Sequence, residues 1–83
     1  MIPPPLWEQL RNTPVRKLIR ALEHDGFRYK RRKGVARVYR HPDGRRVSIH
    51  YHHGGDTLPL GTLRQVIEAT SWTKDDLRRL DLL

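Results

Sequence analysis

Apolar residues recur along this chain with two different periods, and the change of period separates helices from strands. Between residues 15 and 22 the apolar positions follow helical spacing, which predicts a helix with one apolar stripe. Thr13 is expected to cap this helix, with Pro14 in its first position. Gly26 is expected to end it, because glycine readily adopts the positive φ that follows a helix.

Three short strands are predicted next, over residues 27–32, 35–41 and 46–52. Lys33-Gly34 and Pro42-Asp43-Gly44 supply the two turns between them. In the third strand one side carries Val47, Ile49 and Tyr51, and the other carries Arg46, Ser48, His50 and His52. The sheet is therefore expected to have one apolar face and one basic, histidine-rich face.

The remaining segments complete a small α+β domain. A second helix is predicted to start at Pro59 or at Gly61-Thr62, and a short last helix at Thr73. Residues 1–12, with three prolines, are predicted to form an N-terminal arm whose apolar side chains dock on the body, and residues 13–83 to form the domain. The expected order is helix, three antiparallel strands, helix and a short C-terminal helix. Two helices then cover the apolar face of the sheet.

The charge of the chain indicates what kind of partner it binds. The 83 residues carry 17 Lys and Arg against 9 Asp and Glu, a net charge of +8. Residues 28–53 hold nine of these cations, four of the five histidines and one acid, Asp43. Such a density attracts a polyanion, and nucleic acid is the first candidate. A membrane surface is the second, but no basic amphipathic helix supports it.

Other classes of function find little support in the sequence. There is no cysteine, so disulfides and thiolate metal sites are excluded. Met1 to Pro5 do not look like a signal peptide and no apolar run has membrane-spanning length, so a cytoplasmic protein is expected. His50, His52 and His53 invite a metal interpretation, but Asp56 is the one carboxylate near them. We expect neither a metal nor a cofactor.

Four short runs of this sequence form a recognisable set: LEHDGF (22–27), RKG (32–34), YRHPDGRRV (39–47) and PLGTLR (59–64). Together they resemble the HicA family of bacterial toxin ribonucleases. The resemblance covers roughly residues 15–80. It implies a fold like the double-stranded-RNA-binding domain, with helix, three strands and helix. It also implies metal-independent cleavage of single-stranded mRNA and a HicB-like antitoxin as partner.

The resemblance further implies a catalytic histidine after a Gly-Ser pair, and here the chain departs from the family. Gly34-Val35-Ala36 stands in place of Gly-Ser-His, so Ala36 occupies the catalytic position and cannot transfer a proton. Either the histidine was replaced deliberately, or this is a natural branch that lost or moved the catalytic group. Val35 is a second departure, which favours the natural branch.

His50 is the substitute that strand alternation favours, because it lies on the polar face of the third strand; a solvated residue or an antitoxin contact is the simpler interpretation. The predicted RNA-binding residues lie in and around the first two turns: Arg31, Arg32, Lys33, Gly34, Arg37, Arg40, Arg45 and Arg46. Two rival functions stay open. One is a non-catalytic RNA-binding module, and the other is a protein that only binds an antitoxin. Steep salt dependence of RNA binding would separate the two.

Overall fold

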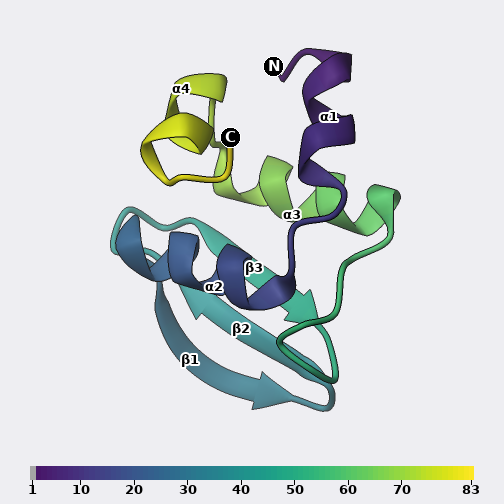
Figure 1. The fold of residues 1–83 in the computed structure, drawn as a ribbon. Coiled ribbons are helices and arrows are strands. Elements are labelled where there is room, and N and C mark those ends of the chain that lie inside the picture. Colours follow the sequence, from purple (N-terminus) through teal and green to yellow (C-terminus); the bar gives the residue numbers. More distant parts are fainter. Residues whose placement is uncertain (1) are drawn as a thin grey trace.

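The computed structural model describes residues 2–83, which form one three-stranded antiparallel sheet and four helices. The elements are α1 (Pro4–Leu10), α2 (Val15–His24), β1 (Arg28–Lys33), β2 (Ala36–Arg40), β3 (Arg46–His50), α3 (Leu60–Thr70) and α4 (Lys74–Arg79). The strand order is β1-β2-β3; α2 lies across the strands and α3 runs beside β3 (Figure 1). The predicted α+β class and its order of elements are confirmed.

The C-terminus of α2 ends as the sequence predicts. Gly26 has φ of 103°, and its N–H donates to the carbonyl of Glu23. The next N–H, of Phe27, donates to the carbonyl of Leu22. This pair of hydrogen bonds is a Schellman motif, which satisfies the last carbonyls of a helix and reverses the chain. It turns the chain directly from α2 into β1.

The N-terminus of α2 differs from the prediction by one residue. Pro14 itself is the N-cap, the helix begins at Val15, and no side chain caps it. The connector before α3 supplies the missing acceptors instead. The amides of Val15 and Arg16 donate to the carbonyls of Asp56 and Gly54, at 2.8 and 2.9 Å. These partners lie about forty residues away along the chain, so the sequence around the helix start gives no sign of them. The local sequence therefore suggests Thr13 as the cap, although the connector already satisfies these amides.

The N-terminal segment, predicted as an arm, contains the helix α1. Pro4 and Pro5 stand in the first turn of α1, where their missing N–H groups cost nothing. Trp7 is 8% exposed and Leu10 is fully buried, so the expected docking of this segment on the body is confirmed. Full burial of a leucine contributes about 1.5–3 kcal/mol.

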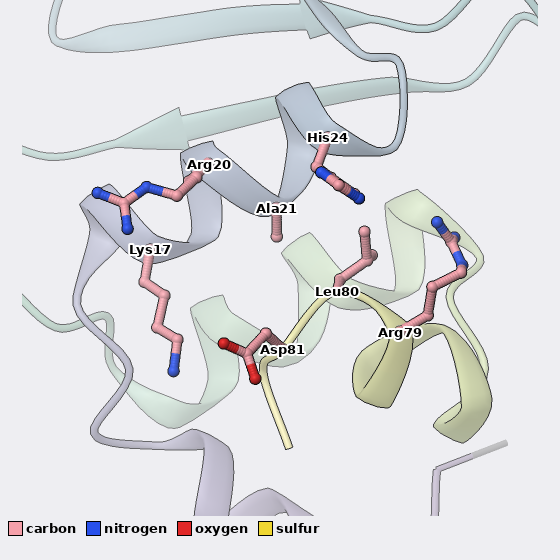
Figure 2. Close-up of a pocket in the computed structure, with 7 residues that line it drawn as sticks. All are labelled: Lys17, Arg20, Ala21, His24, Arg79, Leu80 and Asp81. Carbon is pink, nitrogen blue, oxygen red and sulfur yellow. The ribbon is translucent and has the colours of Figure 1, made fainter.

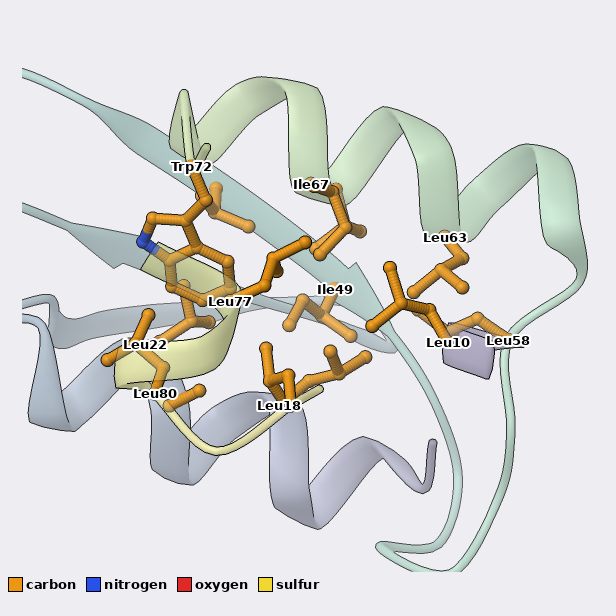
Figure 3. Packing of buried hydrophobic residues seen from close by; sticks show 14 of the residues in the cluster. Leu10, Leu18, Leu22, Ile49, Leu58, Leu63, Ile67, Trp72, Leu77 and Leu80 are labelled. Atoms are coloured by element: carbon orange, nitrogen blue, oxygen red, sulfur yellow. The ribbon is translucent and has the colours of Figure 1, made fainter. Parts of the chain in front are cut away.

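One hydrophobic core joins all of the helices to one face of the sheet (Figure 3). The sheet contributes Tyr39 from β2 and Val47 and Ile49 from β3. The helices and their flanking loops contribute the larger share: Trp7, Leu10, Leu18, Leu22, Leu63, Ile67, Trp72, Leu77 and Leu80. The predicted start of α4 is also confirmed, since Thr73 and Asp76 form a reciprocal capping box.

Strand β3 is shorter than predicted, and this changes the place of two side chains. It ends at His50 instead of residue 52. Tyr51 is half-buried against the core, while His52 lies exposed in the connector and does not share a strand face with His50. Among residues 2–83, no helix has the length and apolar character needed to cross a bilayer.

Candidate nucleic-acid interface

The face of the sheet that points away from the core is open to solvent. Strand register assigns nine residues to this open face: Arg28, Arg31, Lys33, Ala36, Val38, Arg40, Arg46, Ser48 and His50. They alternate along β2 and β3 with the core residues Tyr39, Val47 and Ile49. Ala36 and Val38 are almost fully buried yet belong to no part of the core cluster, because side chains of the flanking strands surround them on this face.

The open face carries its charge in rows that cross the three strands. Arg28 lies opposite Arg40, and Arg40 lies opposite Arg46, so one row consists of three arginines. Opposed like charges on neighbouring strands destabilise a sheet, and we take for each pair the roughly 0.2–1 kcal/mol by which a favourable cross-strand pair stabilises it. The register thus concentrates positive charge at a measurable cost, which an anionic ligand would offset.

A bulge in β1 adds a further cation to the same face. The register shifts between Tyr29 and Arg31, so Lys30 is an extra residue and Arg31 pairs with Val38. The resulting hollow has a volume of about 430 Å³, with Val38 as its apolar floor and four cations around it: Lys30, Arg31, Arg40 and Arg46. A second hollow of about 280 Å³ shares Lys30 and Arg40 and extends toward the Pro42-Gly44 turn. Together they form a cationic groove across the sheet.

Ala36 and His50 meet at the other end of this face. They are directly opposite in the register of β2 and β3, and Lys33 lies opposite Ala36 on the β1 side. Opposed residues in antiparallel strands have their Cβ atoms about 4.5–5.5 Å apart. A side chain longer than alanine at position 36 would therefore project from the open face between an ammonium group and an imidazole.

Four of the eight predicted RNA-binding residues lie outside the open face: Arg32, Gly34, Arg37 and Arg45. Arg32 pairs with Arg37 on the other side of the sheet, and its Nε donates to the carbonyl of Gly34 at 3.0 Å. Arg37 is half-buried with its guanidinium 4.8 Å from the ring centre of Tyr51. Gly34 has φ of 61° and serves the turn between β1 and β2.

Arg45 is engaged inside the fold. Its side chain is 24% exposed, and its Nε donates to the carboxylate of Asp43 at 2.8 Å. One terminal nitrogen lies 3.3 Å from the carboxylate of Asp25 and also donates to the carbonyl of Thr70. The guanidinium stacks 4.9 Å from the ring centre of Phe27. The sequence does not distinguish Arg45 from Arg46, but in the structure their side chains lie on opposite sides of the sheet.

Asp25 is the centre of that internal network. Its carboxylate is 11% exposed and accepts hydrogen bonds from Trp72 Nε1 at 2.9 Å and from the Arg79 guanidinium at 2.8 Å. Burial alone would raise the pKa of Asp25, but these two hydrogen bonds and the charge of Arg45 outweigh it and lower the pKa. The network joins the end of α2 to the second turn and to the start and end of α4.

His41 orders the second turn of the sheet. One ring nitrogen lies 2.9 Å from the carbonyl of Asp25, and the other accepts the backbone N–H of Asp43 at 3.1 Å. The ring sits directly over Gly26, where a Cβ would lie 2.9 Å from His41 Nε2. Within residues 2–83, no group of three histidine, cysteine or acidic side chains is arranged to hold a metal ion.

The tyrosines of β1 and β2 offer no stacking surface on the open face. Tyr39 is 4% exposed, and burial, followed by the nearby phenol of Tyr51, raises its pKa. Tyr29 is half exposed, but its ring packs edge-on against Tyr39 on the helical side of the sheet. The open face is therefore suited to phosphates more than to bases.

Comparison with known protein families supports one assignment. A family model described as the HicA toxin of bacterial toxin–antitoxin systems matches residues 15–72, more than two thirds of the chain. The match contains α2, the whole sheet and α3, and it leaves α1 and α4 outside. No curated protein matches the chain significantly.

Proposed function

The chain belongs to the HicA family of toxins from bacterial toxin–antitoxin systems, and we propose that it binds single-stranded mRNA across the open face of its sheet. The observation that carries this proposal is the row of three arginines with the cationic groove beside it. Lys and Arg side chains supply most of the affinity of a protein for a nucleic-acid backbone. No acidic side chain stands among the nine residues of the open face.

The same face contains the place where RNA cleavage would occur. Cleavage requires a group that removes the 2′-hydroxyl proton, a group that protonates the leaving 5′-oxygen, and cations that stabilise the phosphorane. Lys33 and the neighbouring arginines meet the last requirement, and His50 offers one imidazole. Ala36 offers no proton-transfer group. We propose that this protein holds mRNA but lacks the rate of cleavage that a histidine at position 36 would give.

Ala36 also favours a second candidate function, a non-catalytic RNA-binding module that acts by occupying mRNA. The two candidates share the open face and differ only in whether His50 supports residual cleavage. In both, the site of action is the cytoplasm and a HicB-like antitoxin is the protein partner. An antitoxin that covers the open face would prevent RNA from binding there, whether or not cleavage follows.

The test is cleavage of a single-stranded RNA, with chelator present, by this chain and by its Ala36→His variant. A positioned proton-transfer group contributes roughly 10²–10⁴-fold in rate, so the variant is expected to cut at least about 10²-fold faster. Ser48→His is the matched control, because it adds an imidazole to the same face in a different row. It should leave the rate unchanged.

Two other results would be decisive against parts of this proposal. If the chain with Ala36 already cuts as fast as Ala36→His, position 36 is not the catalytic position, and His50→Ala becomes the next variant. If neither protein cuts but both bind RNA with steep salt dependence, the binding module is the function. Absence of RNA binding by this chain at low salt would refute the proposal as a whole.

A further inference from the structure

Another cationic hollow lies on the helical side of the molecule, between α2 and the end of α4 (Figure 2). Its volume is about 180 Å³, the share of about six water molecules in the liquid. Ala21 and Leu80 form an apolar floor, and charged or polar side chains form the rims: Lys17, Arg20, His24, Arg79 and Asp81. We call this hollow the α2–α4 groove. The open face uses none of its residues.

The cations on the α2 side of the groove have no internal partner. Within residues 2–83, no carboxylate lies within 4.0 Å of Lys17 or Arg20. These two residues and His24 are spaced by three and four positions, so they line one side of the helix. Figure 2 shows Lys17 and His24 reaching from α2 toward the C-terminal segment, with Arg20 on the outer rim. They span about 10 Å along the helix axis.

The opposite rim is fixed by an unusual backbone conformation. Asp81 has φ of 63°, in the position after α4 where a Schellman motif usually has glycine. The N–H of Leu82 donates to the carbonyl of Leu77, and the N–H of Asp81 to that of Arg78. A left-handed residue other than glycine costs roughly 1–2 kcal/mol. The motif holds the Asp81 carboxylate at the edge of the groove, where it is the one acid against three unpaired basic side chains.

We propose that the α2–α4 groove is a second site for the phosphate backbone of RNA. Its size and apolar floor suit a phosphate with part of its sugar, and its unpaired cations supply the charge that a phosphodiester needs. The Cα atoms of the protein span only 33 × 27 × 18 Å, so a single-stranded RNA of ordinary mRNA length is long enough to contact both this groove and the open face. The proposal rests on the proposed function for the identity of the ligand. Arg79, Leu80 and Asp81 lie beyond the family match, so the groove is built partly from this chain's own C-terminal segment.

The test measures the affinity of single-stranded RNA at several salt concentrations for Lys17→Ala/Arg20→Ala and for Asp81→Asn. For single strands the logarithm of affinity falls with the logarithm of salt by about 0.7 for each phosphate contacted. The double variant should therefore bind more weakly, with a slope smaller by about 1.4. Asp81→Asn should bind more tightly, because asparagine tolerates the same backbone and removes the opposing charge. Arg78→Gln, on the exposed side of α4, is the control for net charge.

The outcome of an open-face variant, Arg40→Gln, separates this proposal from the proposed function. If Arg40→Gln lowers affinity while Lys17→Ala/Arg20→Ala and Asp81→Asn behave like Arg78→Gln, the groove does not bind RNA and the proposal is overturned. If the groove variants change affinity and Arg40→Gln does not, the groove stands and the open face is wrong. The proposal would also be overturned if the groove variants bound RNA normally but no longer bound an antitoxin.

Discussion

Replacing Arg40 by glutamine should weaken RNA binding and stabilise the fold at the same time. Arg40 is the middle residue of the arginine row and lies opposite both Arg28 and Arg46. At roughly 0.2–1 kcal/mol for each like-charged pair, its neutralisation should raise the free energy of unfolding by about 0.4–2 kcal/mol. For a domain of this size that corresponds to an increase in Tm of about 2 °C or more. Glutamine keeps two of the three side-chain methylenes of arginine, so little packing is lost.

The binding change is measured as a salt slope. Loss of one phosphate contact should reduce the slope of log affinity against log salt by about 0.7. When the salt is raised from 50 to 200 mM, the factor by which affinity falls should therefore be about 2.6 times smaller for Arg40→Gln than for the unmodified chain. Fluorescence anisotropy of a labelled RNA gives the slope, and thermal unfolding gives Tm. Arg78→Gln removes the same charge on α4 and should change neither the slope nor the sheet. A variant that unfolds at a lower temperature and binds with an unchanged slope would refute the reasoning.

Three further predictions concern the scaffold that presents this face. Asp25→Ala should cost about 1–3 kcal/mol in urea unfolding, because it leaves the part-buried Trp72 Nε1–H without its acceptor and removes one partner of Arg45. The fold lowers the pKa of Asp25, so the ionised carboxylate should contribute fully to the free energy of unfolding above about pH 4. This contribution should be lost as the pH falls through the lower pKa of the folded state. Unfolding of this chain and of Asp25→Asn at pH 2–6 checks this, and a difference between them that does not change with pH would contradict it. Gly26→Ala should destabilise by at least about 1 kcal/mol, because a Cβ would meet His41 at 2.9 Å with φ of 103°; an unchanged Tm would contradict it. Leu10→Ala should cost about 2–5 kcal/mol, and a change below 1 kcal/mol would show that residues 1–12 form an arm independent of the core.

The parts of the fold that local sequence determines were predictable. Helical spacing over residues 15–22 and the glycine after it define α2 and its Schellman end. Strict alternation over residues 46–50 places Arg46, Ser48 and His50 on one face, which the register confirms. Thr73 and Asp76 predict the start of α4 because a capping box needs no distant partner.

The parts that depend on distant contacts were not predictable from one sequence. The cap of α2 comes from carbonyls in the connector before α3. The bulge at Lys30 moves Arg31 to the open face, whereas simple alternation from Tyr29 would place Arg31 on the helical side. Arg45 does not reach that face because its guanidinium binds Asp25 and Thr70, which are 20 and 25 residues away in the sequence. The α2–α4 groove likewise exists only because α4 packs beside α2.

The most direct test of the central claim follows the arginine side chains themselves during RNA binding. In ¹⁵N-labelled protein, the Nε–H signals of Arg31, Arg40 and Arg46 should shift as single-stranded RNA is added at low salt, because these groups line the open face. The signals of Arg37 and Arg45, which are engaged with Tyr51 and Asp43, should stay in place and serve as internal controls. If Arg37 and Arg45 shift while the open-face arginines do not, RNA binds elsewhere and the account is wrong.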